Sequence, residues 1–263
     1  MLANELIQKF EEFAPKTISF PHDPIGIQIG STNHQIKRLL VTLDVRPEVV
    51  DEAIEKHCDF IFSHHPLIFR PIKNMNLANP QNAMYAKLID HHIMVYSAHT
   101  NLDVAEGGMN DWLANAMHLN QVQKVYSSHY DLNIGRIGEL AESISVLEFA
   151  KKLKHTFNLD GLRLVSADNQ QMIKKVGVIG GDGGKFYPDM IRNGAEVFVT
   201  GDVYYHTGHD MLANHLNVID VGHNVEKICI PNLAKLFATW KEANNWNVEI
   251  EESKVNTNPY QFI

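Results

Sequence analysis

Residues 36–66, IKRLLVTLDVRPEVVDEAIEKHCDFIFSHHP, contain the pattern that determines the fold class. Within them, residues 36–44 and 58–62 are short apolar runs typical of strands buried in a parallel sheet. Pro47 stands between these runs at a position where a helix can begin, and residues 48–56 continue it with a helical pattern. Strand, helix and strand in succession predict a βαβ unit within a mostly parallel sheet.

The second half of the chain repeats this pattern at a nearly constant offset. Residues 59–63 align with residues 196–200 at an offset of 137 (196 − 59), whereas Asp103 aligns with Glu226 at an offset of 123 (226 − 103). The change corresponds to a deletion of 14 residues (137 − 123), about the length of the segment from Leu67 to Pro80. Chance similarity between two βαβ patterns is the alternative, but the unbroken offset over each stretch favours an internal duplication.

These patterns predict an α/β protein of two similar lobes, each a mostly parallel sheet flanked by helices. We expect residues 1–127 to form the first lobe and residues 128–263 the second, with the C-terminal segment packing back on the first lobe. A chain of 263 residues, of which 44% are hydrophobic and 21% charged, can bury a sizeable core and is not composed like a disordered protein.

Composition argues against several classes of protein. Two cysteines cannot form a disulfide framework, which fits a reducing compartment. No apolar run approaches the roughly 18 residues of a membrane span, and the acidic N-terminal segment does not resemble a signal peptide. We therefore expect a cytoplasmic protein without a membrane partner. The net charge of −8 argues against a dedicated DNA-binding protein, although a local basic patch remains compatible with it.

Five of the residues that follow predicted strands are candidate metal ligands: His64, His65, Asp103, His223 and Glu226. His64 and His65 directly follow a strand, at the edge where open α/β sheets bind their ligands. Asp103 follows the next strand, whose C-terminal loop is expected beside the first. His223 and Glu226 are three residues apart and so share one face of a helical turn. The alternatives are two surface histidines in a loop and an aspartate that caps a helix.

This set of side chains favours a dinuclear transition-metal centre. Three nitrogen ligands and two carboxylates are too few for two metal ions unless one carboxylate, with a water molecule, bridges them. Imidazole and carboxylate ligands together suit Zn, Mn, Fe or Ni and do not favour Ca or Mg. We therefore expect two divalent transition-metal ions per chain, whose identity the sequence does not specify.

Five segments also resemble the motifs of a known family: Ser63–Pro66, His99–Asp103, Gly107–Asp111, Thr200–Asp202 and Gly222–Glu226. They are similar, in the same order, to motifs of the GTP cyclohydrolase 1 type 2 homologs, also called Nif-three-like dinuclear metal centre proteins. The resemblance covers nearly the whole chain. It implies a two-lobed α/β protomer, a metal centre in the cleft between the lobes and a toroidal homohexamer.

The same resemblance implies a role for each candidate ligand. His64 and Asp103 resemble the ligands of one metal, His65 and His223 those of the other, and Glu226 resembles the bridging carboxylate. Many family members place this glutamate four residues after the histidine, whereas Glu226 is three residues after His223. The assignment of Glu226 therefore depends most on a direct test.

The resemblance implies a metal-dependent hydrolase that acts on a nucleotide or related phosphorylated compound through a metal-activated water. The alternative is a non-catalytic hexameric metal-binding or regulatory scaffold for a protein or nucleic-acid partner, and the sequence does not decide whether the protein is an enzyme. Asp202, His206 and His99 remain open between a role beside the metals and an ordinary loop position. Residues 180–185, GGDGGK, lack the Ser or Thr of a Walker motif and predict a tight strand-to-helix turn.

Overall fold

The computed structural model describes residues 1–263, which divide into two compact units. Unit 1 comprises Met1–Ala105 and Lys227–Thr257, and unit 2 comprises Glu106–Glu226 and Asn258–Ile263. The chain therefore passes from one unit to the other near residues 105, 226 and 257, whereas the sequence places the lobe boundary at residue 127. None of the helices combines the length and the apolar character needed to cross a membrane.

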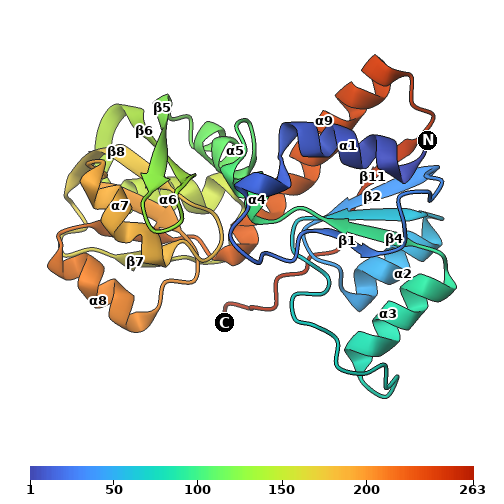
Figure 1. Ribbon diagram of the computed structural model, residues 1–263. Coiled ribbons are helices and arrows are strands. Elements are labelled where there is room, and N and C mark those ends of the chain that lie inside the picture. The colour runs from blue at the N-terminus through green and yellow to red at the C-terminus, as the bar shows by residue number, and fades with distance from the viewer. The chain divides into compact units, whose positions relative to one another are not determined.

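Each unit contains one sheet with helices around it (Figure 1). The elements of unit 1 are α1 (Ala3–Phe13), η1 (Lys16–Ile18), β1 (Gly26–Ile29), β2 (Arg38–Thr42), α2 (Pro47–Glu55), β3 (Phe60–Ser63), α3 (Pro80–Asp90), β4 (Met94–Ser97), α4 (Thr100–Val104), α9 (Cys229–Asn244) and β11 (Glu249–Glu252). The elements of unit 2 are α5 (Met109–Ala116), β5 (Asn120–Ser127), β6 (Leu132–Ser145), α6 (Val146–Thr156), β7 (Arg163–Val165), β8 (Met172–Val178), η2 (Gly184–Phe186), α7 (Tyr187–Arg192), β9 (Val197–Thr200), α8 (Tyr205–Ala213) and β10 (Asn217–Asp220). A short 3₁₀ helix, η3 (His223–Ile228), follows β10.

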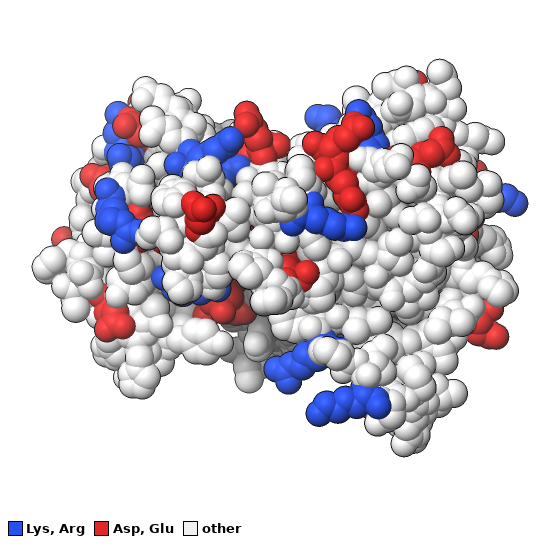
Figure 2. Space-filling model, viewed as in Figure 1, with Lys and Arg blue, Asp and Glu red and all other residues white.

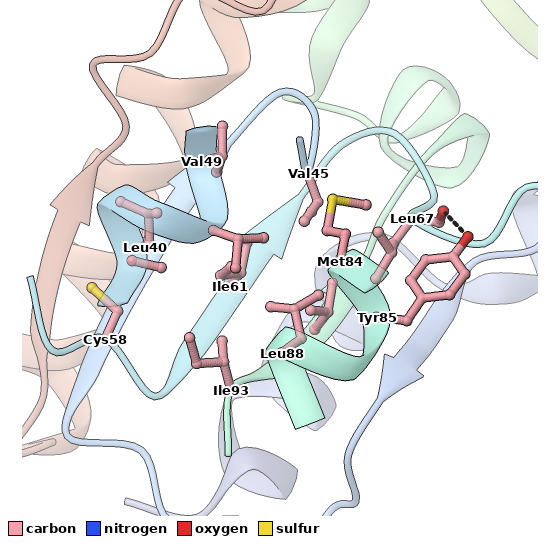
Figure 3. Packing of buried hydrophobic residues seen from close by; sticks show 13 residues of the cluster. Leu40, Val45, Val49, Cys58, Ile61, Leu67, Met84, Tyr85, Leu88 and Ile93 are labelled. Atoms are coloured by element: carbon pink, nitrogen blue, oxygen red, sulfur yellow. Dashed lines mark hydrogen bonds between the residues drawn. The ribbon is translucent and has the colours of Figure 1, made fainter. Parts of the chain in front are cut away.

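The sheet of unit 1 has the order β1-β4-β3-β2-β11, in which β4, β3, β2 and β11 are parallel and β1 is an antiparallel edge. Helices α2 and α3 cover one face and α1 and α9 the other (Figure 1). Successive side chains of a strand point to opposite faces, so Ile61 of β3 joins the aliphatic cluster beneath α2 and α3 (Figure 3). Phe62 points the other way, where its ring centroid lies 4.8 Å from that of Phe10 and 4.9 Å from that of Phe237. Two apolar layers therefore hold the end of β3 in place.

The sheet of unit 2 is mixed, with the order β5-β6-β8-β9-β10-β7. Only β8, β9 and β10 are parallel to one another, because β5, β6 and β7 join the sheet through antiparallel pairs. The parallel arrangement predicted for the second lobe is thus limited to its centre. The sequence did not predict β5 and β6, because most side chains of β5 face solvent and leave no apolar run to recognise.

The predicted repeat is visible in the strand pairing, which has the same register in both units. Leu39 pairs with Phe60 between β2 and β3, and Val176 pairs with Val197 between β8 and β9, each 137 residues further on. Phe60 also pairs with Met94 of β4, just as Val197 pairs with Asn217 of β10, which lies 123 residues beyond Met94. Both units therefore end three parallel strands at the same level, and the candidate ligands follow these ends.

Candidate metal centre

His64 is fully buried in unit 1 directly after β3. Its Nδ1 atom lies 2.8 Å from the carbonyl oxygen of Ala98, the residue that follows β4. A carbonyl oxygen can only accept, so Nδ1 carries the proton and Nε2 carries the lone pair. Nε2 lies 3.6 Å from Oδ1 of Asp103, which α4 supplies. The structure thus places this predicted nitrogen and this predicted carboxylate side by side.

His65 is oriented by a carboxylate that the sequence analysis did not assign. Its Nδ1 atom lies 2.7 Å from Oδ1 of Asp44, in the turn after β2, and Thr257 donates a hydrogen bond to the other oxygen of Asp44. Burial alone would raise the pKa of Asp44, but the hydrogen bond from His65 and its charge hold that pKa below its ordinary value. Asp44 therefore stays ionised and fixes the His65 ring through Nδ1, so that Nε2 is the ring nitrogen that could bind a metal.

His99, left open by the sequence, belongs to the same group of side chains. Its Nδ1 atom lies 2.8 Å from Oδ1 of Asp23, and Asp23 also accepts a hydrogen bond from the backbone N–H of Thr100. Burial raises the pKa of Asp23, but these hydrogen bonds and the charge of His99 lower it further than burial raises it. The ring nitrogens that His64, His65 and His99 could offer a metal lie within 4.8 Å of one another. Its position two residues after the end of β4 was the signal that could have placed His99 here.

In unit 2, His223 and Glu226 lie on one side of η3, as the three-residue spacing predicts. Nε2 of His223 is 3.3 Å from Oε2 of Glu226, whose side chain is almost fully buried. Nδ1 of His223 is 2.7 Å from Oδ2 of Asp202, in the turn after β9. Burial lowers the pKa of His223, but the two carboxylates outweigh it and raise that pKa to about 11. Asp202 therefore contacts the ring of His223 through Nδ1, which answers the question that the sequence left open about this aspartate.

The turn formed by the GGDGGK segment passes directly against this pair. A Cβ atom on Gly181 would lie 2.7 Å from Oε1 of Glu226 and 3.1 Å from Nε2 of His223, and one on Gly180 would lie 3.0 Å from Oε1 of Glu226. Gly181 also has a φ of +58°, which glycine adopts without strain. The glycines are required because the backbone approaches the two candidate ligands more closely than a side chain would permit.

Unit 2 also contains His206, which the sequence left open. It is on the first turn of α8, where its ring centroid lies 5.4 Å from that of Tyr205. The predicted tight turn is present, since residues 180–183 lie between β8 and η2, which begins at Gly184.

The four histidines share one arrangement that suits metal binding. His64, His65, His99 and His223 each place Nδ1 at a carbonyl or carboxylate oxygen. A metal-binding histidine usually binds the ion through one ring nitrogen and donates a hydrogen bond from the N–H of the other, which fixes the orientation of the ring. Nitrogen and carboxylate donors of this kind fit a divalent transition metal. Unit 1 contains His64, His65, His99 and Asp103, and unit 2 contains His223 and Glu226.

The model of the family DUF34/NIF3 (NGG1p interacting factor 3) matches residues 1–259. The chain belongs to this family. A DUF34/NIF3 relative from Streptococcus pneumoniae, called GTP cyclohydrolase 1 type 2 homolog, is 42% identical over the full length of both chains. A Bacillus subtilis protein of the same name is 32% identical, with 98% of each chain covered. The sequence motifs therefore identified the correct family.

Solved structures of similar proteins have the same fold as this chain. A Bacillus cereus protein described as related to NIF3 superimposes with a TM-score of 0.95 at 29% identity and covers 100% of this chain and 99% of its own. A hypothetical protein from Staphylococcus aureus gives the same score, identity and coverage. The two-sheet α/β fold predicted from the sequence is confirmed by this similarity.

Proposed function

We propose that the protein holds two divalent transition-metal ions and hydrolyses a nucleotide or a related phosphorylated compound. The ligands would be His64, His65 and Asp103 of unit 1 with His223 and Glu226 of unit 2. The single observation that carries the proposal is the anchoring of every candidate histidine through Nδ1, the arrangement typical of metal-binding rings. When bound, such ions lower the pKa of a coordinated water and polarise the group under attack.

The side chains around the ligands have separate tasks in this proposal. Asp44 and Asp202 hold the rings of His65 and His223 in one orientation, so that little ordering is needed when an ion binds. His99 and Asp23 form a histidine–carboxylate pair beside His64 and His65, a pair suited to accept or donate a proton during hydrolysis. The buried carboxylate of Glu226 is the group proposed to bridge the two ions.

The name of the relatives, GTP cyclohydrolase 1 type 2 homolog, supports a nucleotide as the class of substrate. The family resemblance further supports self-association into a homohexamer. The net charge of −8 means that an anionic nucleotide requires local positive charge, which the bound ions would supply together with nearby basic side chains.

The test is turnover of a panel of nucleotides by the metal-loaded protein, compared with the variants His65→Ala and His155→Ala. His155 is an exposed histidine near the end of α6 and serves as the matched control. We expect metal-dependent hydrolysis that His65→Ala abolishes and His155→Ala leaves unchanged. If the wild type converts nothing that His65→Ala fails to convert, the hydrolase proposal is wrong and the metal-binding scaffold becomes the better account.

A further inference from the structure

The segment between β3 and α3, residues 67–79, is the part of unit 1 that has no counterpart in unit 2. It accounts for most of the 14-residue change in the repeat offset and begins two residues after His65. From Phe69 onwards every residue of the segment is exposed. Its exposed side chains include four large apolar ones: Phe69, Ile72, Met75 and Leu77.

Hydrogen bonds hold this exposed segment to the unit beneath it. Tyr85 of α3 donates to the carbonyl oxygen of Leu67 at 3.3 Å. The buried side chain of Asn82 donates to the carbonyl oxygens of Asn74 and Asn76 at 3.1 and 3.0 Å. The segment is therefore anchored near both ends, so the exposure of its apolar side chains is a feature of the fold.

The charge of this region is opposite to that of the whole chain. No acidic residue occurs between Asp59 and Asp90, whereas Arg70, Lys73 and Lys87 lie in that interval of a chain whose net charge is −8. Lys87 forms an ion pair with Asp51, but Arg70 and Lys73 are exposed and form none. In Figure 2, basic side chains stand beside uncharged surface around the segment that leads into α3 in Figure 1.

Phe69 brings this apolar and basic surface to the edge of the histidine group. Its ring centroid lies 6.4 Å from that of His99 in an edge-to-face arrangement, with 87° between the two planes. His99 lies next to His64 and His65, with ring centroids 5.4 and 5.7 Å away. Since Phe69 remains 62% exposed, much of its ring is available to another planar group.

We propose that Phe69 and Arg70 recognise the base and the phosphate of a nucleotide bound at the histidine group. An exposed aromatic ring stacks on any base, and an arginine pairs with phosphate through two parallel hydrogen bonds. Lys73, three residues further along the segment, adds a second positive charge to it. The inference rests on the proposed function, because it assumes that the substrate binds at these histidines. It adds that the substrate carries an aromatic base, which an aliphatic phosphate ester lacks.

The test measures binding by isothermal titration calorimetry with the metal-loaded full chain. The probes are guanosine monophosphate, ribose 5-phosphate and inorganic phosphate. We expect Phe69→Ala to weaken the binding of guanosine monophosphate about tenfold or more, the effect of losing one stacking partner. The binding of the other two probes should stay unchanged. Phe69→Trp should restore the binding of guanosine monophosphate, and Arg70→Ala should weaken the binding of guanosine monophosphate and of ribose 5-phosphate alike. Ile89→Ala, at another exposed apolar side chain of the same unit, should change nothing.

Three results would overturn the inference: equal binding of guanosine monophosphate by Phe69→Ala and wild type, equal binding of ribose 5-phosphate and guanosine monophosphate by the wild type, or no binding of any probe. Elemental analysis of the same samples separates this failure from failure of the metal proposal, since Phe69→Ala should keep its full metal content. Sedimentation velocity provides the last check. A change in mass caused by Phe69→Ala would assign the segment to contacts between copies of the chain and would also overturn the inference.

Discussion

The turn after β3 in unit 1 and the turn after β9 in unit 2 occupy the same place in the repeated framework but carry different side chains. With the offset of 137, His64 corresponds to Gly201 (64 + 137) and His65 to Asp202 (65 + 137). Unit 1 therefore uses this turn for two candidate nitrogen ligands. Unit 2 uses the same turn for a carboxylate that orients a histidine from the next strand. The repeated strands determine the position of each turn, whereas the residue at that position determines whether it is a candidate ligand or orients one.

The turns after β2 and β8 show the reverse exchange. Asp44, which orients His65, corresponds to Gly181 (44 + 137). A side chain at Gly181 would lie 2.7 Å from Glu226, so this turn has no room for an orienting carboxylate. Asp202 takes over that task in unit 2. Asp44 and Asp202 thus perform the same task from turns that are not equivalent in the repeat.

The largest expected effect on stability comes from Gly201→Ala, in the turn after β9 that corresponds to the turn after β3. A Cβ atom there would lie 2.8 Å from backbone atoms of Gly222 and His223, which cannot move aside as a flexible side chain could. We expect this variant to lower the free energy of unfolding by about 3 kcal/mol, the upper end for an overpacked site. Denaturant unfolding measures this change. Gly184→Ala is the control, because its nearest neighbours lie 4.0 Å away. If both variants unfold at the same denaturant concentration, the close packing around Gly201 is not essential.

The next effect tests whether the two orienting aspartates perform the same task. Asp44→Asn and Asp202→Asn should each weaken metal binding about 10- to 100-fold, the usual cost of losing a partner behind a metal-binding histidine. Competition with a metal chelator measures this affinity, and Asp160→Asn, at an exposed aspartate of unit 2, is the control. An effect confined to one of the two variants would show that the exchange between turns is structural only.

A smaller effect tests the framework that the two units share. Asp59 accepts hydrogen bonds from the backbone N–H groups of Lys37 and Arg38, and Glu196 accepts them from Lys174 and Lys175 at the equivalent positions. Asp59→Ala and Glu196→Ala should each reduce the free energy of unfolding by about 1 kcal/mol. Denaturant unfolding checks this expectation, and clearly unequal losses would contradict the equivalence of the two strand beginnings.

The smallest effect concerns Glu52 on α2, where the units differ. Burial raises its pKa, but hydrogen bonds from Ser253 and Lys254 and the charge of Lys56 lower that pKa below its ordinary value of 4.5. A carboxyl whose pKa is lowered by folding stabilises the fold above its unfolded pKa and loses this contribution as the pH falls through its folded pKa.

Glu52→Gln should therefore be slightly less stable than the wild type at neutral pH, with the difference shrinking below pH 4.5. Thermal unfolding across that range measures it. Asp189, the equivalent residue of unit 2 (52 + 137), pairs instead with Arg192 within its own helix. A difference that stays constant with pH would contradict the account of Glu52.

The strands that the sequence predicted and those it missed differ in a physical way. The cores of β3 and β9 are buried on both faces and consist of continuous apolar residues, which the sequence displays directly. β5 is an edge strand whose side chains are mostly exposed, and β6 alternates apolar residues with polar and small ones. The two strands pair as a hairpin and β6 also pairs with β8, but neither contains the continuous apolar run by which β3 and β9 were recognised.

The chain contains 15 histidines, and four of them have a role unrelated to metal binding. His57, His92, His118 and His215 each lie two residues after the end of a helix and have a φ between +54° and +59°. Histidine, like asparagine and aspartate, is enriched in this left-handed conformation. Such residues terminate helices, so these four histidines have a use that is independent of the candidate metal centre.

The sequence could propose candidate ligands, but it could not propose the partners that orient their rings. His64, His65 and Asp103 follow predicted strands, and this position along the chain made them candidates. Asp44 and Asp23 contact histidines 21 and 76 residues away, through turns whose conformation no local pattern specifies.

The central claim is that ligands from both units bind two metal ions, and metal content tests it most directly. Elemental analysis of the purified wild-type chain should give about two transition-metal ions per chain. Asp103→Ala in unit 1 and Glu226→Ala in unit 2 should each give fewer. Unchanged metal content in both variants, or a wild type that binds no transition metal, would contradict the claim.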